Sequence, residues 1–222
     1  MIRTGLLWSG IILLTMIAAS VYGWNELPEG AQFPVHWDTE GTPNRFAGKL
    51  ETLWAIPLLT AFLILVFTLA PLFEKRRENL MQSSALYLTG WIGGIGLMGL
   101  GHLITITAAI KGDAPPVKLL FVVIALFLIA AGNFMAKSRR NRIAGIKTPW
   151  TLKSDHAWSV ANRLAGWGFV LTGLFSALSA LVLPSKTALY IMLAGVSASV
   201  LVSVVMSYFA WRDDPMRDGS NG

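Results

Sequence analysis

Long apolar segments alternate with short polar ones along the chain. Six of the apolar segments have the length of about 20 residues that a helix needs to cross a hydrocarbon core of about 30 Å. They lie near residues 5–24, 50–73, 85–110, 117–136, 164–183 and 188–211. Polar backbone groups inside lipid must be paired within their own segment, and no alternating strand pattern indicates a barrel. The pattern therefore predicts an all-α polytopic membrane protein with six transmembrane helices.

Composition agrees with this class and excludes others. Hydrophobic residues make up 54% of the chain and charged residues 14%, against about 25% charged residues in soluble domains. The net charge of +6 comes from short loops rather than from one long basic face, so we expect no direct nucleic-acid binding. Without cysteine, disulfides and thiolate metal ligands are excluded. The first apolar segment is longer than a usual signal-peptide core, so we expect it to be a retained span.

Lysine and arginine are distributed unevenly between the two sides of this topology. One side has thirteen of them: Arg3, Lys75, Arg76, Arg77, Lys137, Arg139, Arg140, Arg142, Lys147, Lys153, Arg163, Arg212 and Arg217. The other has five: Arg45, Lys49, Lys111, Lys118 and Lys186. By the positive-inside rule, both termini and the loop at 137–163 are cytoplasmic, and the loop at 25–49 is external. Tryptophans mark the borders, with Trp24, Trp37 and Trp54 on the outer face and Trp8, Trp91, Trp150, Trp158 and Trp211 on the inner one.

The external loop has the pattern of a strand followed by a turn. In an extended run, Val35 and Trp37 would point to one side, and His36 and Asp38 to the other. The residues Glu40-Gly41-Thr42-Pro43 then supply turn chemistry. We expect this element to lie at the outer surface. Its candidate functional residues are His36, Asp38, Gly41, Pro43, Asn44, Arg45 and Lys49.

The cytoplasmic loop at 137–163, which we call the motif loop, concentrates polar, basic and aromatic residues between two spans. Ser154 can cap a helix whose first turn contains Asp155. We expect a short interfacial helix leading into the fifth span, with Trp150 and Trp158 as anchors. Asn141, Arg142, Thr148 and Asn162 could hydrogen-bond one another to lock the loop. The candidate residues are Asn141, Arg142, Gly145, Lys147, Thr148, Pro149, Trp150, Thr151, Trp158 and Asn162.

His102 and Asn133 are the polar side chains deepest in the apolar segments. An ionisable group inside a membrane is a functional candidate, yet no carboxylate in a central span could serve His102 as a proton partner. A structural hydrogen bond to a neighbouring helix is the alternative, and we favour it for both residues. The three histidines lack a ligand set for a metal, and no motif of an enzyme or nucleotide cofactor occurs. We therefore expect no metal, no cofactor and no catalysis.

Small residues at four-residue spacing mark faces where helices can approach closely in lipid. The third span is the richest in glycine, with Gly90, Gly93, Gly94, Gly96, Gly99 and Gly101. The sixth span has Gly195, Ser199, Ser203 and Ser207 on one stripe. We expect these residues to pack the bundle internally, with formation of a homo-oligomer as the alternative.

Two motifs resemble a known family. The run Asn141-Arg142-Ile143-Ala144-Gly145-Ile146-Lys147-Thr148-Pro149-Trp150-Thr151-Leu152 is similar to the signature of the SdpI family, which gives immunity to the sporulation-delaying-protein toxin. Residues 33–49 resemble the DUF1648-type region that precedes it in many members. The signature usually has arginine where this chain has Lys147, which lacks the planar bidentate fork of arginine. The resemblance divides the chain into residues 1–73, with the external loop, and 74–222, with the motif loop.

The resemblance implies a multi-pass protein of the bacterial inner (cytoplasmic) membrane that protects the cell from a secreted toxic peptide. Its partners would be the lipid bilayer, that peptide and, in the best-known system of this kind, a cytoplasmic transcriptional repressor captured at the membrane. A transporter that exports a peptide or a small lipophilic compound is the alternative, supported by His102 and the glycine-rich third span. No convincing internal repeat of the kind found in many carriers supports it.

Overall fold

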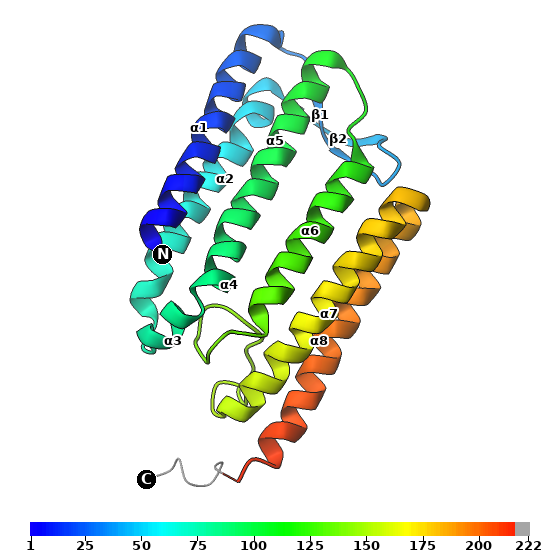
Figure 1. Ribbon diagram of the computed structural model, residues 1–222. Coiled ribbons are helices and arrows are strands. Elements are labelled where there is room, and N and C mark those ends of the chain that lie inside the picture. The colour runs from blue at the N-terminus through cyan, green and yellow to red at the C-terminus, as the bar shows by residue number, and fades with distance from the viewer. Residues whose placement is uncertain (216–222) are drawn as a thin grey trace.

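The computed structural model describes residues 1–215 as an elongated helical bundle with a small β-hairpin at one end (Figure 1). The elements are α1 (Ile2–Glu26), β1 (Gln32–Trp37), β2 (Pro43–Gly48), α2 (Lys49–Leu69), the 3₁₀ turn η1 (Ala70–Phe73), α3 (Arg77–Gln82), α4 (Ser84–Leu88), the π-helical turn η2 (Thr89–Gly93), α5 (Gly94–Lys111), α6 (Val117–Met135), α7 (Asp155–Val182) and α8 (Ser185–Arg212). Within this part of the chain, six helical stretches are long and apolar enough to cross a membrane. The predicted fold class is confirmed.

The fifth span differs from its prediction. Helix α7 runs without a break over Asp155–Val182, so there is no separate interfacial helix before the span. The Ser154 hydroxyl caps this helix as expected, because it accepts a hydrogen bond from the Ala157 backbone N–H at 3.0 Å. Trp158, Ala161 and Ala165 are buried on one face of α7. Burial of that face against the rest of the bundle explains why the helix starts nine residues earlier than its most apolar part.

The bundle consists of two groups of helices. α1, α2 and α5 pack against one another, and α7 packs along both α6 and α8. The main contacts between the two groups are those of α4 and η2 with α6, near the end of the bundle that carries the motif loop. The ribbons of α5 and α6 run apart from there toward the hairpin end (Figure 1). The structure therefore has a closed end and a divergent end.

The closest approach of two helix backbones lies between α6 and α7 rather than on the glycine-rich third span. A Cβ atom on Gly132 would lie 2.5 Å from the Gly166 carbonyl oxygen, so the two backbones touch there. On the third span, only Gly93 and Gly99 contact other helices. The expectation of internal packing is wrong for the other glycines, since a Cβ would meet nothing within 4 Å at Gly90, Gly94, Gly96 and Gly101.

The small-residue stripe of the sixth span is confirmed as a packing face. A Cβ on Gly168 of α7 would come within 2.5 Å of the Ser199 side chain, and Gly195 lies against Thr172. Ser203 and Ser207 are also buried. This stripe therefore joins α8 to α7.

Two tryptophans expected at the inner border are instead buried. Trp91 is fully buried and stacks on Phe67, with ring centroids 5.7 Å apart. It fills the space beside Gly5, where a Cβ would lie 2.5 Å from its ring. Trp158 is 2% exposed. Both rings fill gaps between helices, which an apolar run in the sequence does not distinguish from anchoring in the interface.

The predicted strand and turn form an antiparallel hairpin, β1 with β2. The register is irregular around Val35, so the strict alternation expected for residues 35 to 38 does not hold. Phe33 packs with Leu53 and Ile106, which ties the hairpin to the first group of helices. At its tip, a Cβ on Gly41 would lie 3.7 Å from the Ala114 side chain, beside the connection from α5 to α6. The hairpin thus crosses the divergent end.

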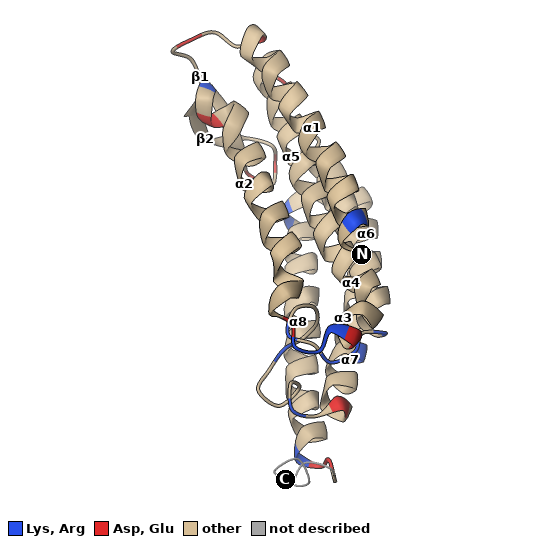
Figure 2. Ribbon diagram, turned by 90° about the vertical axis from the view of Figure 1, so that its left-hand side faces the viewer, with Lys and Arg blue, Asp and Glu red and all other residues tan. Residues whose placement is uncertain are grey.

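Basic residues gather at the closed end of the bundle (Figure 2). This agrees with the uneven lysine and arginine count, although the structure contains no membrane and the cytoplasmic placement of this end stays a prediction. Arg217, which entered that count, lies outside the described residues. We keep the predicted orientation as a working frame, with the hairpin outside.

Candidate functional site

The motif loop begins with a turn that is built around the buried side chain of Asn141. Its Oδ1 accepts hydrogen bonds from the backbone N–H groups of Ile143 and Ala144, both at 2.8 Å. Its Nδ2 donates to the carbonyl oxygens of Arg139 at 2.8 Å and Ala144 at 3.2 Å. An asparagine can accept and donate in this way within one short turn. Asn141 is therefore a structural residue of the loop.

Gly145 brings the loop directly against α7. Its φ of 126° lies in a region that side chains rarely adopt, and a Cβ there would lie 2.5 Å from the Asn162 Oδ1 and 2.8 Å from the Trp158 ring. The same Asn162 Oδ1 accepts a hydrogen bond from the Ile146 N–H at 2.8 Å. The Trp158 ring N–H donates to the Ser138 carbonyl at 3.1 Å. Three motif residues thus lock the loop onto one face of α7.

We expect Gly145→Ala to lower the stability of the protein by roughly 2 to 4 kcal/mol, the sum of backbone strain and overpacking. The measurement is the thermal unfolding midpoint of the purified protein in detergent. Gly112→Ala is the matched control, because Gly112 also has a positive φ, 74°, but a Cβ there would meet nothing within 4 Å. Equal losses for the two variants would contradict the contact with Asn162 and Trp158.

The second half of the motif is closed by Thr151, which is fully buried. Its hydroxyl oxygen accepts a hydrogen bond from the Thr148 N–H at 2.8 Å, and the Thr151 N–H is 3.2 Å from the Thr148 hydroxyl. Pro149 lies exposed between them. Trp150 fixes this turn to α8, since its ring N–H donates to the Ser207 hydroxyl at 2.9 Å. Trp150 thus makes a contact within the protein, and its expected role as a headgroup anchor stays a prediction.

The side chain of Glu74 joins the first group of helices to the motif loop, and sequence reasoning missed it. The carboxylate is 3% exposed. One oxygen accepts the Arg76 N–H at 2.7 Å, and the other accepts the Arg142 N–H at 2.5 Å. The available signal was an acidic residue directly before the basic run 75–77, but we interpreted that run only as a sign of topology.

Two further polar residues make the same connection. The hydroxyl oxygen of Ser83, which is buried, accepts the Arg139 N–H at 2.8 Å. The Asn79 amide donates to the Arg140 carbonyl at 2.8 Å. Together with Glu74, these side chains bind the backbone of residues 139–142 to the segment around α3. They hold the closed end of the bundle together.

The predicted mutual hydrogen bonds among Asn141, Arg142, Thr148 and Asn162 are not present; each asparagine bonds backbone groups instead. The Arg142 side chain is exposed, and so is that of Lys147, whose ammonium group donates to the Ile143 carbonyl at 2.8 Å. The motif therefore combines buried residues that shape the loop with two exposed basic side chains.

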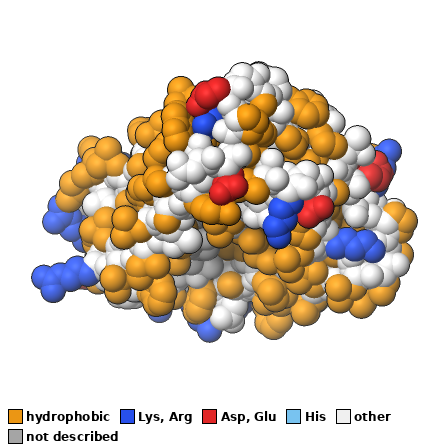
Figure 3. Space-filling model, turned by 90° about the horizontal axis from the view of Figure 1, so that it is seen from above, with side chains coloured by type: hydrophobic (Ala, Val, Ile, Leu, Met, Phe, Trp, Pro, Cys, Tyr) orange, Lys and Arg blue, Asp and Glu red, His pale blue; other side chains and the backbone are white. Residues whose placement is uncertain are grey.

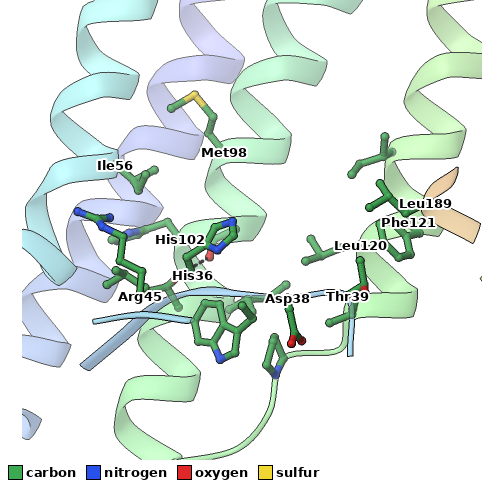
Figure 4. A pocket seen from close by; sticks show the side chains of 18 of the residues that line it. His36, Asp38, Thr39, Arg45, Ile56, Met98, His102, Leu120, Phe121 and Leu189 are labelled. Carbon is green, nitrogen blue, oxygen red and sulfur yellow. Dashed lines mark hydrogen bonds between the residues drawn. The ribbon is translucent and has the colours of Figure 1, made fainter. Parts of the chain in front are cut away.

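At the divergent end, a cavity of about 740 Å³ lies between the two groups of helices, beneath the hairpin. Its walls come from β1, β2, α2, α5, α6 and α8. Figure 4 shows His36, Asp38 and Arg45 from the hairpin at one end of the cavity, and Ile56 and Met98 at the other. The deep part is mainly apolar, with Leu120, Phe121 and Leu189 on the opposite wall. These elements are far apart in the sequence.

The remaining external candidates stabilise the hairpin. One Asp38 carboxylate oxygen accepts the backbone N–H groups of Glu40 and Thr42, at 2.9 and 2.8 Å. Gly41 has a φ of 86°, as a tight turn requires. The remaining side chains pair with neighbours: His36 Nδ1 with Asn44 Oδ1 at 2.6 Å, Arg45 with Glu51, and Lys49 with Glu29 at 2.8 Å. Pro43 lies exposed at the start of β2.

His102 is fully buried beside the cavity and makes the structural hydrogen bond that we favoured. The Ser20 hydroxyl donates to the Leu53 carbonyl at 2.6 Å, and the His102 Nε2 lies 2.9 Å from the same hydroxyl. A hydroxyl has one hydrogen, so we assign the proton of the second bond to the imidazole Nε2. This chain of hydrogen bonds joins α5, α1 and α2.

Asn133 does not behave as predicted. Its side chain is exposed and makes no hydrogen bond among the described residues. It lies two residues before the end of α6, at Met135, so it is nearer to the closed end than to the centre of the bundle. Within residues 1–215, no group of histidine, aspartate or glutamate could hold a metal ion.

Two models of known protein families match separate parts of the chain. Residues 137–207 match the SdpI/YfhL protein family, and residues 11–61 match the domain of unknown function DUF1648. Residues 137–207 therefore carry the similarity of this chain to the SdpI/YfhL family. The chain is 23% identical over 202 residues to the immunity protein SdpI of Bacillus subtilis (strain 168), an alignment that covers 91% of this chain and 93% of that protein. No solved structure matches the chain.

The SdpI/YfhL match begins at the motif loop and ends in α8, so it covers the loop and the helices to which the loop is fixed. The DUF1648 match covers α1 from residue 11, the hairpin and α2 as far as residue 61. The cavity lies where these two regions meet, because its walls include β1 from one and α8 from the other. With six helices that can span a membrane and a similarity to a membrane immunity protein, the chain is a multi-pass protein of a bacterial membrane.

Proposed function

We propose that this chain protects a bacterial cell from a secreted toxic peptide by binding the peptide in the membrane. The similarity to an immunity protein over 91% of the chain supports the class of function. The observation that carries the proposal is the cavity under the hairpin, which opens at the end that the lysine and arginine count places outside. A secreted peptide would reach the membrane from that side. Concave, largely apolar sites are typical of small-ligand and peptide binding.

In this proposal, the motif loop holds the two groups of helices together at the closed end of the bundle. Its buried polar side chains are occupied with internal hydrogen bonds, as Asn141 and Asn162 show. Closure of one end fixes the separation of the two helix groups at the other. A cytoplasmic partner such as a repressor stays a prediction. The exposed side chains of Arg142 and Lys147 are the motif groups that it would contact first.

The test is expression of the full chain in Bacillus subtilis from which the SdpI gene has been removed, followed by exposure to the sporulation-delaying peptide. We expect growth to resume at peptide concentrations that stop cells with an empty vector. Arg142→Ala should keep this protection, because that side chain makes no hydrogen bond within the described residues. Growth arrest of cells that contain the intact protein in their membranes would remove the proposal.

Export is the second candidate, and one observation favours it. Two helix groups that meet at one end and diverge at the other have the form of a carrier open to one side. A carrier would also have to open the end held by Glu74, Ser83 and Asn79. Sealed vesicles containing the protein decide between the two: binding of labelled peptide without gradient-dependent flux indicates immunity by capture, and flux indicates export.

A further inference from the structure

One edge of the hairpin borders the cavity. The last three residues of β1, 35 to 37, line it together with Asp38 and Thr39 of the following turn and Arg45 of β2. In a regular strand, successive side chains point to opposite faces, so a flat face would contribute only every second residue. A continuous run indicates that the strand presents its edge, with the register irregularity at Val35 adding to this exposure. The cavity therefore meets backbone groups as well as side chains.

β1 has one neighbour in its sheet, β2, so its other edge has no strand partner among the described residues. An edge of this kind is a template for main-chain hydrogen bonds with an added strand. The irregular register also leaves Val35 without a partner residue on β2. The backbone groups of β1 can thus form hydrogen bonds with the main chain of an extended peptide, whatever its side chains are.

The rest of the cavity suits the side chains of such a segment. Ile56 and Met98 line one wall, and Leu120 and Phe121 line the wall across from it. Two acidic and two basic side chains border the cavity, so their formal charges cancel: Asp38, Glu51, Arg45 and Lys186. Seen from above, the hairpin end has no large patch of one charge (Figure 3). We therefore expect that net charge does not determine which ligand the cavity binds.

We propose that the cavity binds an extended, apolar segment of the toxic peptide, with the peptide main chain along the free edge of β1 and its side chains between the two helix groups. This inference rests on the proposed function and assigns the binding of the toxic peptide to this cavity. The volume of about 740 Å³ suits a segment of a few residues. A lipid tail could pack against the apolar walls of the cavity, but it has no donors or acceptors for hydrogen bonds with the edge of β1.

Gly101 allows a direct test, because it lines the cavity and a Cβ there would meet nothing within 4 Å. Gly101→Leu therefore places a side chain in the binding space without a clash. Gly94→Leu is the matched control: it lies on the same helix, has the same open surroundings and does not border this cavity. Both variants exchange glycine for a better helix former.

The assay uses the Bacillus subtilis strain without its SdpI gene and the sporulation-delaying peptide as the probe. We expect Gly101→Leu to lower the protective effect about tenfold or more, the equivalent of about 1.4 kcal/mol in binding. Gly94→Leu should protect like the unaltered chain, at equal amounts in the membrane. Full protection by Gly101→Leu would overturn the cavity site alone. Failure of the unaltered chain to protect would instead overturn the proposed function.

A second measurement does not depend on any variant. The peptide carries a photoreactive apolar residue and is cross-linked to the full chain in vesicles of phosphatidylethanolamine and phosphatidylglycerol. We expect cross-links at residues 35–39 and on the facing walls of α5 and α6. Cross-links confined to other surfaces of the helices, or lipid retained in the cavity at saturating peptide, would overturn the proposal.

Discussion

Gly132→Ala should lower the free energy of unfolding by roughly 2 to 3 kcal/mol, at the upper end of the cost of overpacking. The added methyl group would lie 2.5 Å from the Gly166 carbonyl oxygen and 2.9 Å from the Val170 backbone nitrogen. Backbone atoms cannot rotate away as a flexible side chain can. Helix α6 would have to move away from α7, and contacts along both helices would weaken.

Gly94→Ala is the control for this prediction. A Cβ at Gly94 would meet nothing within 4 Å, so the intrinsic preference of alanine for helix should dominate. That preference is worth about 1 kcal/mol in the stabilising direction. The two substitutions therefore have opposite expected signs, and thermal unfolding of the purified proteins in one detergent compares them. Equal shifts would show that α6 and α7 do not approach as closely as the structure indicates.

This contrast shows what the sequence could predict about the fold. The existence of the six spans depends on local apolar content and length, which are visible in the sequence. The pairing of helices is not, because an apolar residue can face lipid or another helix equally well. The third span has the most glycines, yet four of them face open space. Gly132 and Gly166 lie outside the stripes singled out in the sequence, and they make the closest backbone contact.

The candidate site was predictable in part for a similar reason. The motif identified a stretch of the chain, and the structure shows that its asparagines and threonines form the loop. Glu74 was not predicted as a site residue because its partners are the backbone N–H groups of residues 76 and 142. A sequence motif consists of side chains and does not show which backbone groups a side chain will bind. The cavity was not predicted either, because its walls come from six elements that are separate in the sequence. These elements come together only in the folded protein.

Asn141→Leu should have the largest effect of any single substitution in the motif loop. Leucine has nearly the same size, but it removes both hydrogen bonds that the side chain accepts and both that it donates to nearby carbonyls. The backbone N–H groups of Ile143 and Ala144 would lose their acceptor, and each buried donor left unpaired costs about 1 to 3 kcal/mol. We expect a total loss of roughly 3 to 5 kcal/mol, and faster proteolysis within residues 137–154.

Two further substitutions separate hydrogen bonding from the change in polarity. Asn133→Leu alters the same residue type where the side chain is exposed and unbonded among the described residues, so it should leave the unfolding midpoint nearly unchanged. Asn141→Asp keeps an acceptor for Ile143 and Ala144 but places a second carboxylate oxygen against the carbonyls of Arg139 and Ala144. Its stability should fall below that of the unaltered chain, because two acceptors would then face each other. A midpoint for Asn141→Leu equal to that of Asn133→Leu would contradict the structural role of the Asn141 amide, and the closed end would then have to be held together by Glu74 and Ser83.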